Sequence, residues 1–379
     1  MHGTKIALFG SAVDFISDKK ETIMKNADKR KLILVLTLAV SLMLTLAACG
    51  GEGGPVEFDP EKTYTLRMAT MASQGTPLYN SCVWFVDRVS ELTDGNVQIT
   101  LFPSSQLGDY TAVMGEIILG SIDISWQSIA TEYDARFAVE GIPYFASNWD
   151  EVQYAYSKGS WICNLYGTIA GDLGMVHVGG SPSLFLSVAG KNLGNLNDIF
   201  NPDVKKDVLL RIAPFPVNEW IFDYLNYNVT VIPYADLYSA LQTGLADCWY
   251  GGGVELNYDD FRDIIKYYAA FDIAQAYSPL FISGKTMNNL PVEYQDALMQ
   301  AGWEATDQAF KFHMDSEDEY YKKLEAYGIE IIKPTKKQMD VIAAGMREEV
   351  WPRLASLIGD ELLDGLYEFA EQMKADLEK

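Results

Sequence analysis

The chain has 379 residues, 49% hydrophobic and 21% charged, which suits a globular protein of two or three domain-sized units. Its 29 Lys and Arg against 52 Asp and Glu give a formal net charge of −23 at pH 7. A chain this acidic lacks the basic surface that nucleic-acid binding requires. Its negative charge also disfavours electrostatic binding to an anionic membrane.

The N-terminal region has the pattern of an export signal. An uncharged apolar run over residues 32–48 follows a basic cluster formed by Lys25, Lys29, Arg30 and Lys31. This is the order of the n-region and h-region of a secretory signal, so residues 1–48 are interpreted as a signal peptide. Met24 would begin a conventional signal, and we expect the true start there. The alternative is an uncleaved transmembrane anchor, for which 17 residues are just long enough.

The apolar run ends in LAAC, which closes at Cys49 and resembles a bacterial lipobox. The resemblance implies cleavage before Cys49 and a diacylglycerol on its thiol, which would anchor a soluble protein to the membrane. Residues 50–62 are rich in Gly, Pro and Glu, so we interpret 49–62 as the lipidated cysteine and a flexible tether.

Ordered structure is predicted from residue 64 onward. Apolar alternation and helical spacing predict strand, helix, strand, helix and strand over residues 64–70, 77–95, 96–103, 110–123 and 122–128. This order is typical of a parallel sheet with helices on its faces, which binds ligands beyond the C-terminal ends of its strands. Residues 179–183, GGSPS, are interpreted as a turn.

The same order returns in the second half of the chain. Strand, helix, strand, helix and strand are predicted over residues 207–214, 217–227, 228–234, 235–244 and 245–250. Two similar α/β units in one exported chain indicate two lobes with a cleft between them. Residues 291–327 have helical spacing over a length of roughly 50 Å, which predicts a helix that bridges both lobes. A short strand at 328–334 and mostly helical structure from 335 to 379 are expected to follow.

The sequence offers little support for catalysis. Of the histidines beyond the signal region, neither His177 nor His313 belongs to a metal-ligand spacing. Neither a GxSxG nucleophile elbow nor a phosphate-binding loop occurs, so we expect no enzymatic activity, no cofactor and no metal. Cys82, Cys163 and Cys248 are too few for a disulfide framework, and we expect no bridge.

Four segments have recognisable motifs, which are FPSSQLGDYTAVMGEIILGSIDIS from residue 102, GIPYF from 141, LLRIAP from 209, and VIPYADLYSALQTGLAD from 231. Together they resemble the substrate-binding proteins of tripartite ATP-independent periplasmic (TRAP) transporters. The resemblance extends from residue 64 to the C-terminus. It implies an α/β, two-lobed periplasmic-binding-protein fold with a long bridging helix. We expect lobe I to comprise residues 63–185 and about 275–320, and lobe II residues 186–274 and about 321–379.

The resemblance also implies an arginine that clamps a ligand carboxylate, and Arg211 occupies the matching position. A guanidinium offers two parallel N–H donors in the geometry of a carboxylate. Its strand neighbours are apolar, so its charge needs a partner. The alternative to a ligand is an internal salt bridge to an Asp or Glu.

The chain departs from the family pattern at two polar positions. Phe185 stands where many members have a second arginine, and Gly251 stands where an asparagine contacts the ligand. Trp249 and Tyr250 precede Gly251, and Tyr234 matches an aromatic residue that packs on the substrate in the family. Their alternative role is packing in the core. These aromatic residues favour a monocarboxylate with an apolar or aromatic part over a dicarboxylate or a sialic acid.

Loops after the first and third strands of lobe I provide the remaining candidates for the site, which are Met71, Ser73, Gln74, Gln127 and Ser128. We expect an extracytoplasmic, monomeric receptor, anchored through Cys49, that delivers a small organic acid to TRAP permease subunits and binds no nucleic acid. The alternative is a lipid-anchored chemosensory receptor or an enzyme on the same fold.

Overall fold

The computed structural model describes residues 56–379, so the predicted signal peptide, Cys49 and most of the tether lie outside the described residues. The first predicted α/β unit is confirmed. It comprises β1 (Tyr64–Ala69), α3 (Pro77–Leu92), β2 (Val97–Phe102), α4 (Tyr110–Leu119) and β3 (Ile124–Trp126). Strand β1 pairs in parallel with β2 on one side and with β3 on the other.

The second unit has the same order, again as predicted. It comprises β5 (Lys206–Ile212), α7 (Pro216–Tyr224), β6 (Tyr227–Val231), α8 (Tyr234–Thr243) and β7 (Cys248–Gly252). Strand β5 pairs in parallel with β6 and β7. Helix α8 ends where expected, because Gly244 takes a left-handed conformation (φ 80°) that other residues adopt at a cost.

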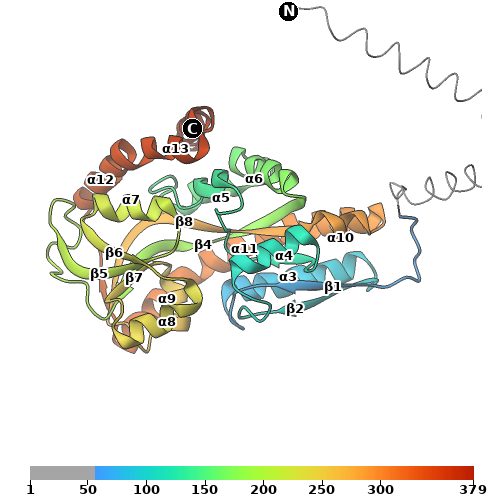
Figure 1. Ribbon diagram of the computed structural model, residues 1–379, viewed down its shortest axis with the longest axis horizontal. Coiled ribbons are helices and arrows are strands. Elements are labelled where there is room, and N and C mark those ends of the chain that lie inside the picture. Colours follow the sequence, from blue (N-terminus) through green and yellow to red (C-terminus); the bar gives the residue numbers. More distant parts are fainter. Residues whose placement is uncertain (1–55) are drawn as a thin grey trace, which may run out of the picture. The chain divides into compact units, whose positions relative to one another are not determined.

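Two long antiparallel strands connect the units and were not predicted. They are β4 (Met175–Gly190) and β8 (Tyr267–Ser283), which run through the middle of the molecule in Figure 1. The sheet order is β2-β1-β3-β8-β4-β7-β5-β6, and β9 (Glu330–Ile332) also pairs with β8. Phe185 pairs with Gln275, so the lobe boundaries expected from the sequence fall opposite each other in these two strands.

The interpretation of residues 179–183 as a turn was wrong, because these residues lie within β4. Glycine and proline usually indicate loops, but here the glycines allow close packing. A Cβ on Gly179 would lie 2.5 Å from the carbonyl oxygen of Gly302, and a Cβ on Gly180 would overlap the ring of Tyr277.

The predicted long helix is α11, which spans Val292–Tyr327 and has 36 residues. It packs on α3 and β4 and, further along, on α9 (Val254–Phe261) and β9, so it contacts both α/β units. Between the units in sequence lie η1 (Ala135–Val139), α5 (Trp149–Tyr156) and α6 (Trp161–Asp172), and α10 (Gly284–Asn288) precedes α11.

The C-terminal segment is helical, as predicted, and it packs against both halves of the chain. It comprises α12 (Lys336–Gly345), η2 (Met346–Val350), η3 (Trp351–Leu354), α13 (Ala355–Ile358) and α14 (Asp360–Leu377). Segment η2 packs on α7, whereas α13 packs on η1 and α14 on α5. Trp351 is fully buried and donates from Nε1 to the carbonyl of Pro143 at 2.8 Å, which ties this segment to the first half.

Cys82, Cys163 and Cys248 are buried and free, as expected. Among the described residues, no helix combines the length and the apolar composition needed to cross a membrane.

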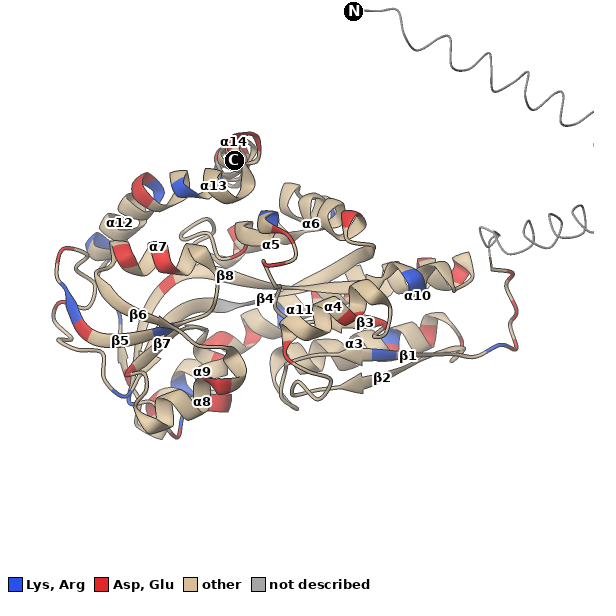
Figure 2. Ribbon diagram, viewed as in Figure 1, with Lys and Arg blue, Asp and Glu red and all other residues tan. Residues whose placement is uncertain are grey.

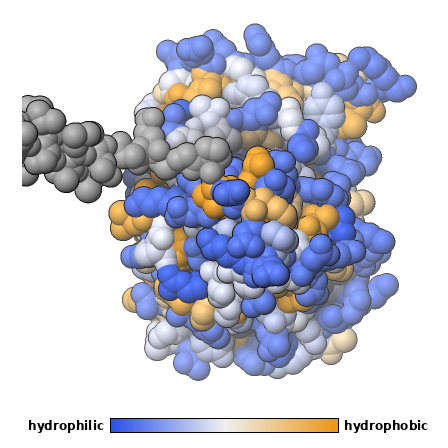
Figure 3. All heavy atoms as spheres, turned by 90° about the vertical axis from the view of Figure 1, so that its right-hand side faces the viewer, coloured by the Kyte–Doolittle hydropathy of each residue, from blue (hydrophilic) through white to orange (hydrophobic). Residues whose placement is uncertain are grey.

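Acidic residues are distributed over many elements in Figure 2, and hydrophilic residues cover most of the face shown in Figure 3.

Candidate ligand-binding cleft

A cavity lies where the two α/β units meet along β4 and β8. It has an empty volume of about 1290 Å³, which includes the space at its open mouth. The first unit contributes the loop after β1, the start of α3 and Ser128 after β3, and the second unit contributes the ends of β5 and β7 with α8 and α9. The cavity therefore lies beyond the C-terminal ends of parallel strands from both units, which is where parallel α/β sheets usually bind ligands.

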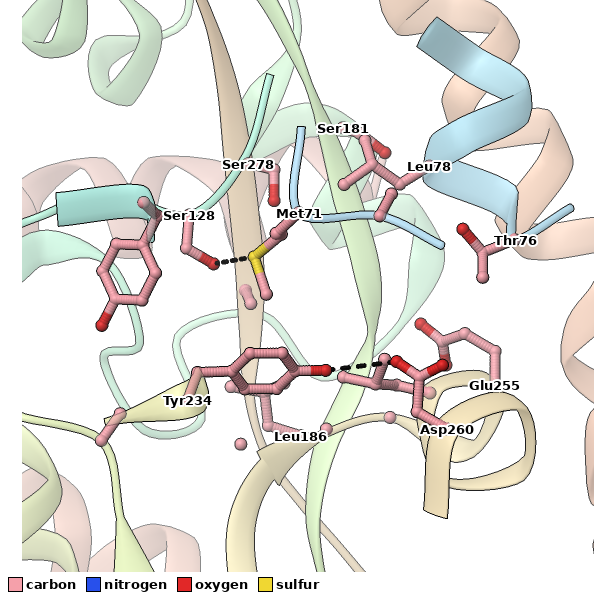
Figure 4. Close-up of a pocket in the computed structure, with 18 of the residues that line it drawn as sticks. Met71, Thr76, Leu78, Ser128, Ser181, Leu186, Tyr234, Glu255, Asp260 and Ser278 are labelled. Carbon is pink, nitrogen blue, oxygen red and sulfur yellow. Dashed lines mark hydrogen bonds between the residues drawn. The ribbon is translucent and has the colours of Figure 1, made fainter. Parts of the chain in front are cut away.

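Most of the residues singled out in the sequence line this cavity. They are Met71, Ser73, Ser128, Arg211, Tyr234, Trp249, Tyr250 and Gly251. Figure 4 shows Met71 and Ser128 in contact, where the Ser128 hydroxyl lies 3.5 Å from the Met71 sulfur.

Three other candidates do not line it. Gln74 is exposed, and Phe185 packs edge-on against Trp149 with ring centroids 5.9 Å apart. Successive side chains of a strand point to opposite faces, so Leu186 lines the cavity in place of Phe185. Gln127 is 3% exposed and lines a smaller cavity, and neither of its amide atoms has a hydrogen-bond partner among the residues that the structure describes.

Arg211 is the only arginine or lysine of the cavity wall among the described residues, and it is 1% exposed at the end of β5. Its Nε donates to the carbonyl of Ile232 at 2.8 Å, but its buried Nη2 has no hydrogen-bond partner within residues 56–379. It forms no ion pair with any described residue, so the internal salt bridge considered as an alternative is not formed. Burial lowers the pKa of Arg211 to about 10, which leaves it charged at neutral pH. A buried, incompletely paired guanidinium beside a cavity is suited to a bidentate anion.

The three glycines after Tyr250 serve different purposes. Gly251 has φ 131°, and a Cβ built on it would lie 3.9 Å from Nη1 of Arg211, so glycine leaves space beside the guanidinium. A Cβ on Gly252 would collide with the ring of Trp249. Gly253 precedes α9 and accepts a hydrogen bond at its carbonyl from Asn257 at 2.8 Å.

The two aromatic residues before the glycines are both 1% exposed but differ in their polar contacts. Trp249 packs on Phe261 with ring centroids 4.7 Å apart and donates from Nε1 to Asn257 at 3.1 Å, so its polar atom is already paired. Tyr250 packs edge-on against Phe222, and its buried hydroxyl has no hydrogen-bond partner in the described part of the chain. Tyr250 is thus a free hydrogen-bond donor in the cavity wall.

Carboxyl groups also line the cavity, and sequence reasoning missed them. They belong to Glu140, Glu255, Asp259 and Asp260. The last three lie on α9, directly after the glycine run, which is the signal that could have indicated them. Glu140 follows η1; burial raises its pKa to about 8, and the backbone of Tyr277 partly offsets this by hydrogen bonding. Glu140 is therefore mostly protonated at neutral pH.

Tyr234 and Asp260 form the most visible polar pair in Figure 4, where the Tyr234 hydroxyl donates to Oδ2 of Asp260 at 3.3 Å. Burial raises the pKa of Asp260, while this hydrogen bond lowers it and neighbouring Asp259 raises it.

The described residues include no group of three or more His, Cys, Asp and Glu side chains that could hold a metal ion.

Comparison with known proteins places the chain in a family. The pattern of the DctP family, described as "Bacterial extracellular solute-binding protein, family 7", matches residues 68–355. Solute-binding protein RD1_1052 of Roseobacter denitrificans is 20% identical over 305 residues, which cover 78% of this chain and 91% of that protein. The sialic acid-binding periplasmic protein SiaP of Vibrio cholerae is 30% identical over 130 residues, which cover 34% of this chain and 37% of that protein.

Solved structures share the fold. The sugar acid binding protein DctPAm of Advenella mimigardefordensis, solved with galactonate, has a TM-score of 0.75 at 18% identity and covers 82% of this chain and 99% of its own. A TRAP periplasmic solute-binding protein of Desulfovibrio salexigens, solved with orotic acid, has a TM-score of 0.74 at 16% identity and covers 82% of this chain and 100% of its own. The family match extends over most of the described chain, through both α/β units and the long helix: the protein belongs to family 7 of the bacterial extracellular solute-binding proteins.

Proposed function

We propose that the protein is a receptor that binds a small organic monocarboxylate with an apolar or aromatic part in the cavity between its lobes. The observation that carries this proposal is Arg211, whose buried Nη2 has no protein partner on the cavity wall. A ligand carboxylate would supply the missing acceptor. The hydroxyl of Tyr250, which lines the same cavity, is a further donor without a partner among the described residues.

The number of cations in the wall limits the number of acid groups on the ligand. With one guanidinium, a second ligand carboxylate would be buried without a cation, which is costly. The apolar part of the wall includes Leu78, Leu186, Tyr234 and Trp249, which would contact an alkyl or aromatic body. Burying such a body would contribute roughly 25 cal/mol per Å² of apolar surface. The acids bound by structural relatives, such as galactonate and orotic acid, support an acidic ligand in general.

Delivery of the ligand to TRAP permease subunits is the role that membership of this family supports. In this proposal, lobe I comprises residues 63–185 and about 275–320, and lobe II residues 186–274 and about 321–379. The lobes would close on the ligand by bending at β4 and β8, where the pairing is irregular between Pro182 and Phe185 and between Leu186 and Val188. The anchor would be lipid on Cys49, after removal of a signal peptide over residues 1–48.

A thermal-shift screen tests the proposed function. The panel contains alkyl monocarboxylates, aromatic monocarboxylates, C4-dicarboxylates and sugar acids. A ligand that binds only the folded protein raises its melting temperature, so monocarboxylates with an apolar body should give the largest shifts. Selective tight binding of a C4-dicarboxylate or a sialic acid would contradict the proposed ligand class.

A further inference from the structure

We infer that the ligand is a zwitterion, with a carboxylate on Arg211 and a cationic group, such as an ammonium, facing the carboxyls of α9. This inference rests on the proposed function, because it takes the carboxylate on Arg211 from it. It adds a second charge of opposite sign to the ligand and therefore names a narrower ligand class.

The charge balance of the cavity wall is the first argument. Arg211 is the only Lys or Arg among the described lining residues, whereas Glu255, Asp259 and Asp260 all line the cavity from α9. Burial lowers the pKa of His313, which also lines the cavity, to about 3, so this histidine is neutral and contributes no positive charge. A simple monocarboxylate would neutralise Arg211 and leave the wall more negative than before.

The position of the acids on α9 is the second argument. Glu255 and Asp259 are four residues apart on a helix, so they lie on one face, and Asp260 follows directly. Figure 4 shows the side chains of Glu255 and Asp260 extending on the same side of the cavity, and Figure 2 shows the acidic residues of this helix. Glu255 is 6% exposed, and its Oε1 lies 3.9 Å from Nδ1 of His313, which also lines the cavity.

The contacts of Asp259 and Asp260 leave room for a cation. Oδ2 of Asp260 accepts from Tyr234, and Oδ2 of Asp259 accepts from Tyr320 at 2.9 Å; both donors are neutral hydroxyls. Each carboxylate has further acceptor sites, and burial raises the pKa of both Asp259 and Asp260. Arg262 lowers the pKa of both aspartates and Lys323 lowers that of Asp259, but neither cation lines the cavity. A hydrogen bond with Ser73, a neutral hydroxyl, also lowers the pKa of Asp260. A cationic ligand group would offset the unfavourable burial of Asp260, and the Tyr234 ring beside it offers an aromatic face to the same group.

Two other residues that line the cavity indicate that the carboxylates of α9 face a ligand. Arg211 and Tyr250 are each 1% exposed, and each has a buried polar atom without a protein partner in the same cavity. Their unpartnered donors suit the carboxylate end of the ligand, and the α9 carboxylates suit its cationic end. The two kinds of group together match a molecule with both charges.

Calorimetry with matched pairs of acids tests the inference on the wild-type protein. Each pair differs by an amino group: 3-phenylpropanoate and phenylalanine, 4-methylpentanoate and leucine, pentanoate and 5-aminopentanoate. The first two pairs place the amine beside the carboxylate, and the third places it at the far end. We expect the amine-bearing member of at least one pair to bind ten-fold or more tightly than its partner, in the presence of EDTA.

Substitutions then locate the cationic group. Asp260→Asn and Glu255→Gln, which remove a charge but keep the shape, should reduce the preference for the amine-bearing acid by about ten-fold. Asp236→Asn, an exposed position on α8 outside the cavity, is the matched control and should leave the preference unchanged. Melting temperatures of the unliganded variants confirm that they fold.

The outcomes separate the inference from the proposed function. If the amine-free acids bind as tightly as the amine-bearing ones or more tightly, the inference of a zwitterionic ligand is wrong, but the proposed function as a carboxylate receptor is not contradicted. If the protein prefers the amine-bearing acid but keeps this preference after both α9 substitutions, the carboxylates of α9 do not recognise the cationic group and the inference is wrong. If no acid of either kind binds the folded protein, the proposed function fails together with the inference.

Discussion

A Cβ built on Gly251 would lie 3.9 Å from Nη1 of Arg211, so the residue after Tyr250 determines how much space remains beside the buried guanidinium. The sequence resemblance places an asparagine of the family at this position. Here glycine leaves that space open, and the cavity wall includes the rings of Tyr234 and Trp249 and the carboxyl groups of α9.

Gly251→Ala should weaken ligand binding and destabilise the protein by about 1–3 kcal/mol, because φ 131° is unfavourable for an L-residue and the methyl group enters the site. Gly244→Ala is the control. It also places alanine at a positive φ, 80°, but no atom lies within 4 Å of the new Cβ. Urea denaturation and calorimetry should show that both variants lose stability but that only Gly251→Ala loses affinity. Equal affinity of the two variants would contradict the role of Gly251.

Gly302→Ala should destabilise the protein by about 1–3 kcal/mol, because a Cβ there would overlap the backbone of Val178 where α11 crosses β4. Gly167→Ala, in α6, is the matched control. No atom lies within 4 Å of a Cβ at Gly167, so that substitution should stabilise by roughly 0.4–1 kcal/mol. Thermal melts of both variants measure the difference, and a neutral Gly302→Ala would mean that α11 can move away from the sheet at little cost.

The two α/β units could be predicted from the sequence, whereas the strands β4 and β8 that join them could not. The strands and helices of each unit show alternation, helical spacing and glycine stops, which depend on local sequence. Strands β4 and β8 are buried along most of their length, so they lack alternation, and Gly179, Gly180 and Pro182 suggest a loop. The need for those glycines arises from α11 and Tyr277, which are distant in sequence.

The site was predictable to a similar extent. Arg211 was identified because it occupies the position of a carboxylate-clamping arginine in the family resemblance, and its apolar strand neighbours agreed with that role. The loops after strands pointed to Met71 and Ser128. Phe185 was placed in the cleft from alignment alone, and the strand alternation of β4 places Leu186 there instead. The acids of α9 resemble a solvated helix face in sequence, although their position directly after the glycine run could have indicated that they line the cavity.

Glu140 should make the stability of the protein depend on pH. Its pKa is about 8 in the folded protein and lies near its ordinary value of 4.5 when unfolded, so between these values the folded state holds the extra proton. The free energy of unfolding therefore falls as pH rises from about 5 to 8, and this loss levels off above the folded pKa. Relative to wild type, Glu140→Gln should become steadily more stable over that range.

Urea denaturation at pH 5, 6, 7, 8 and 9 measures this difference between wild type and Glu140→Gln. The control is Glu293→Gln, at an exposed position on α11, which should follow the wild-type curve. Parallel curves for wild type and Glu140→Gln would show that Glu140 ionises normally in the folded protein.

Cys49→Ser should move the protein from the membrane fraction to the soluble extracytoplasmic fraction, because the thiol that carries the predicted lipid is lost. Cell fractionation with immunoblotting measures the location, and gel mobility reports the processing. A Cys82→Ser variant serves as the control, since Cys82 is buried in the core. A Cys49→Ser protein that stays in the membrane fraction with unchanged mobility would contradict lipidation at Cys49.

The most direct test of the proposed receptor is the calorimetric affinity of the best acid from the screen for wild type, Arg211→Lys and Arg211→Ala. Lysine keeps the charge but loses the two parallel donors, and alanine loses both. Removing a charge-assisted contact from a desolvated site should cost about 2–5 kcal/mol, or roughly 30- to 4,000-fold in affinity, with the alanine variant affected at least as strongly. If both variants fold, as judged by thermal melting, and still bind the acid with wild-type affinity, Arg211 does not anchor the ligand and the proposed site is wrong.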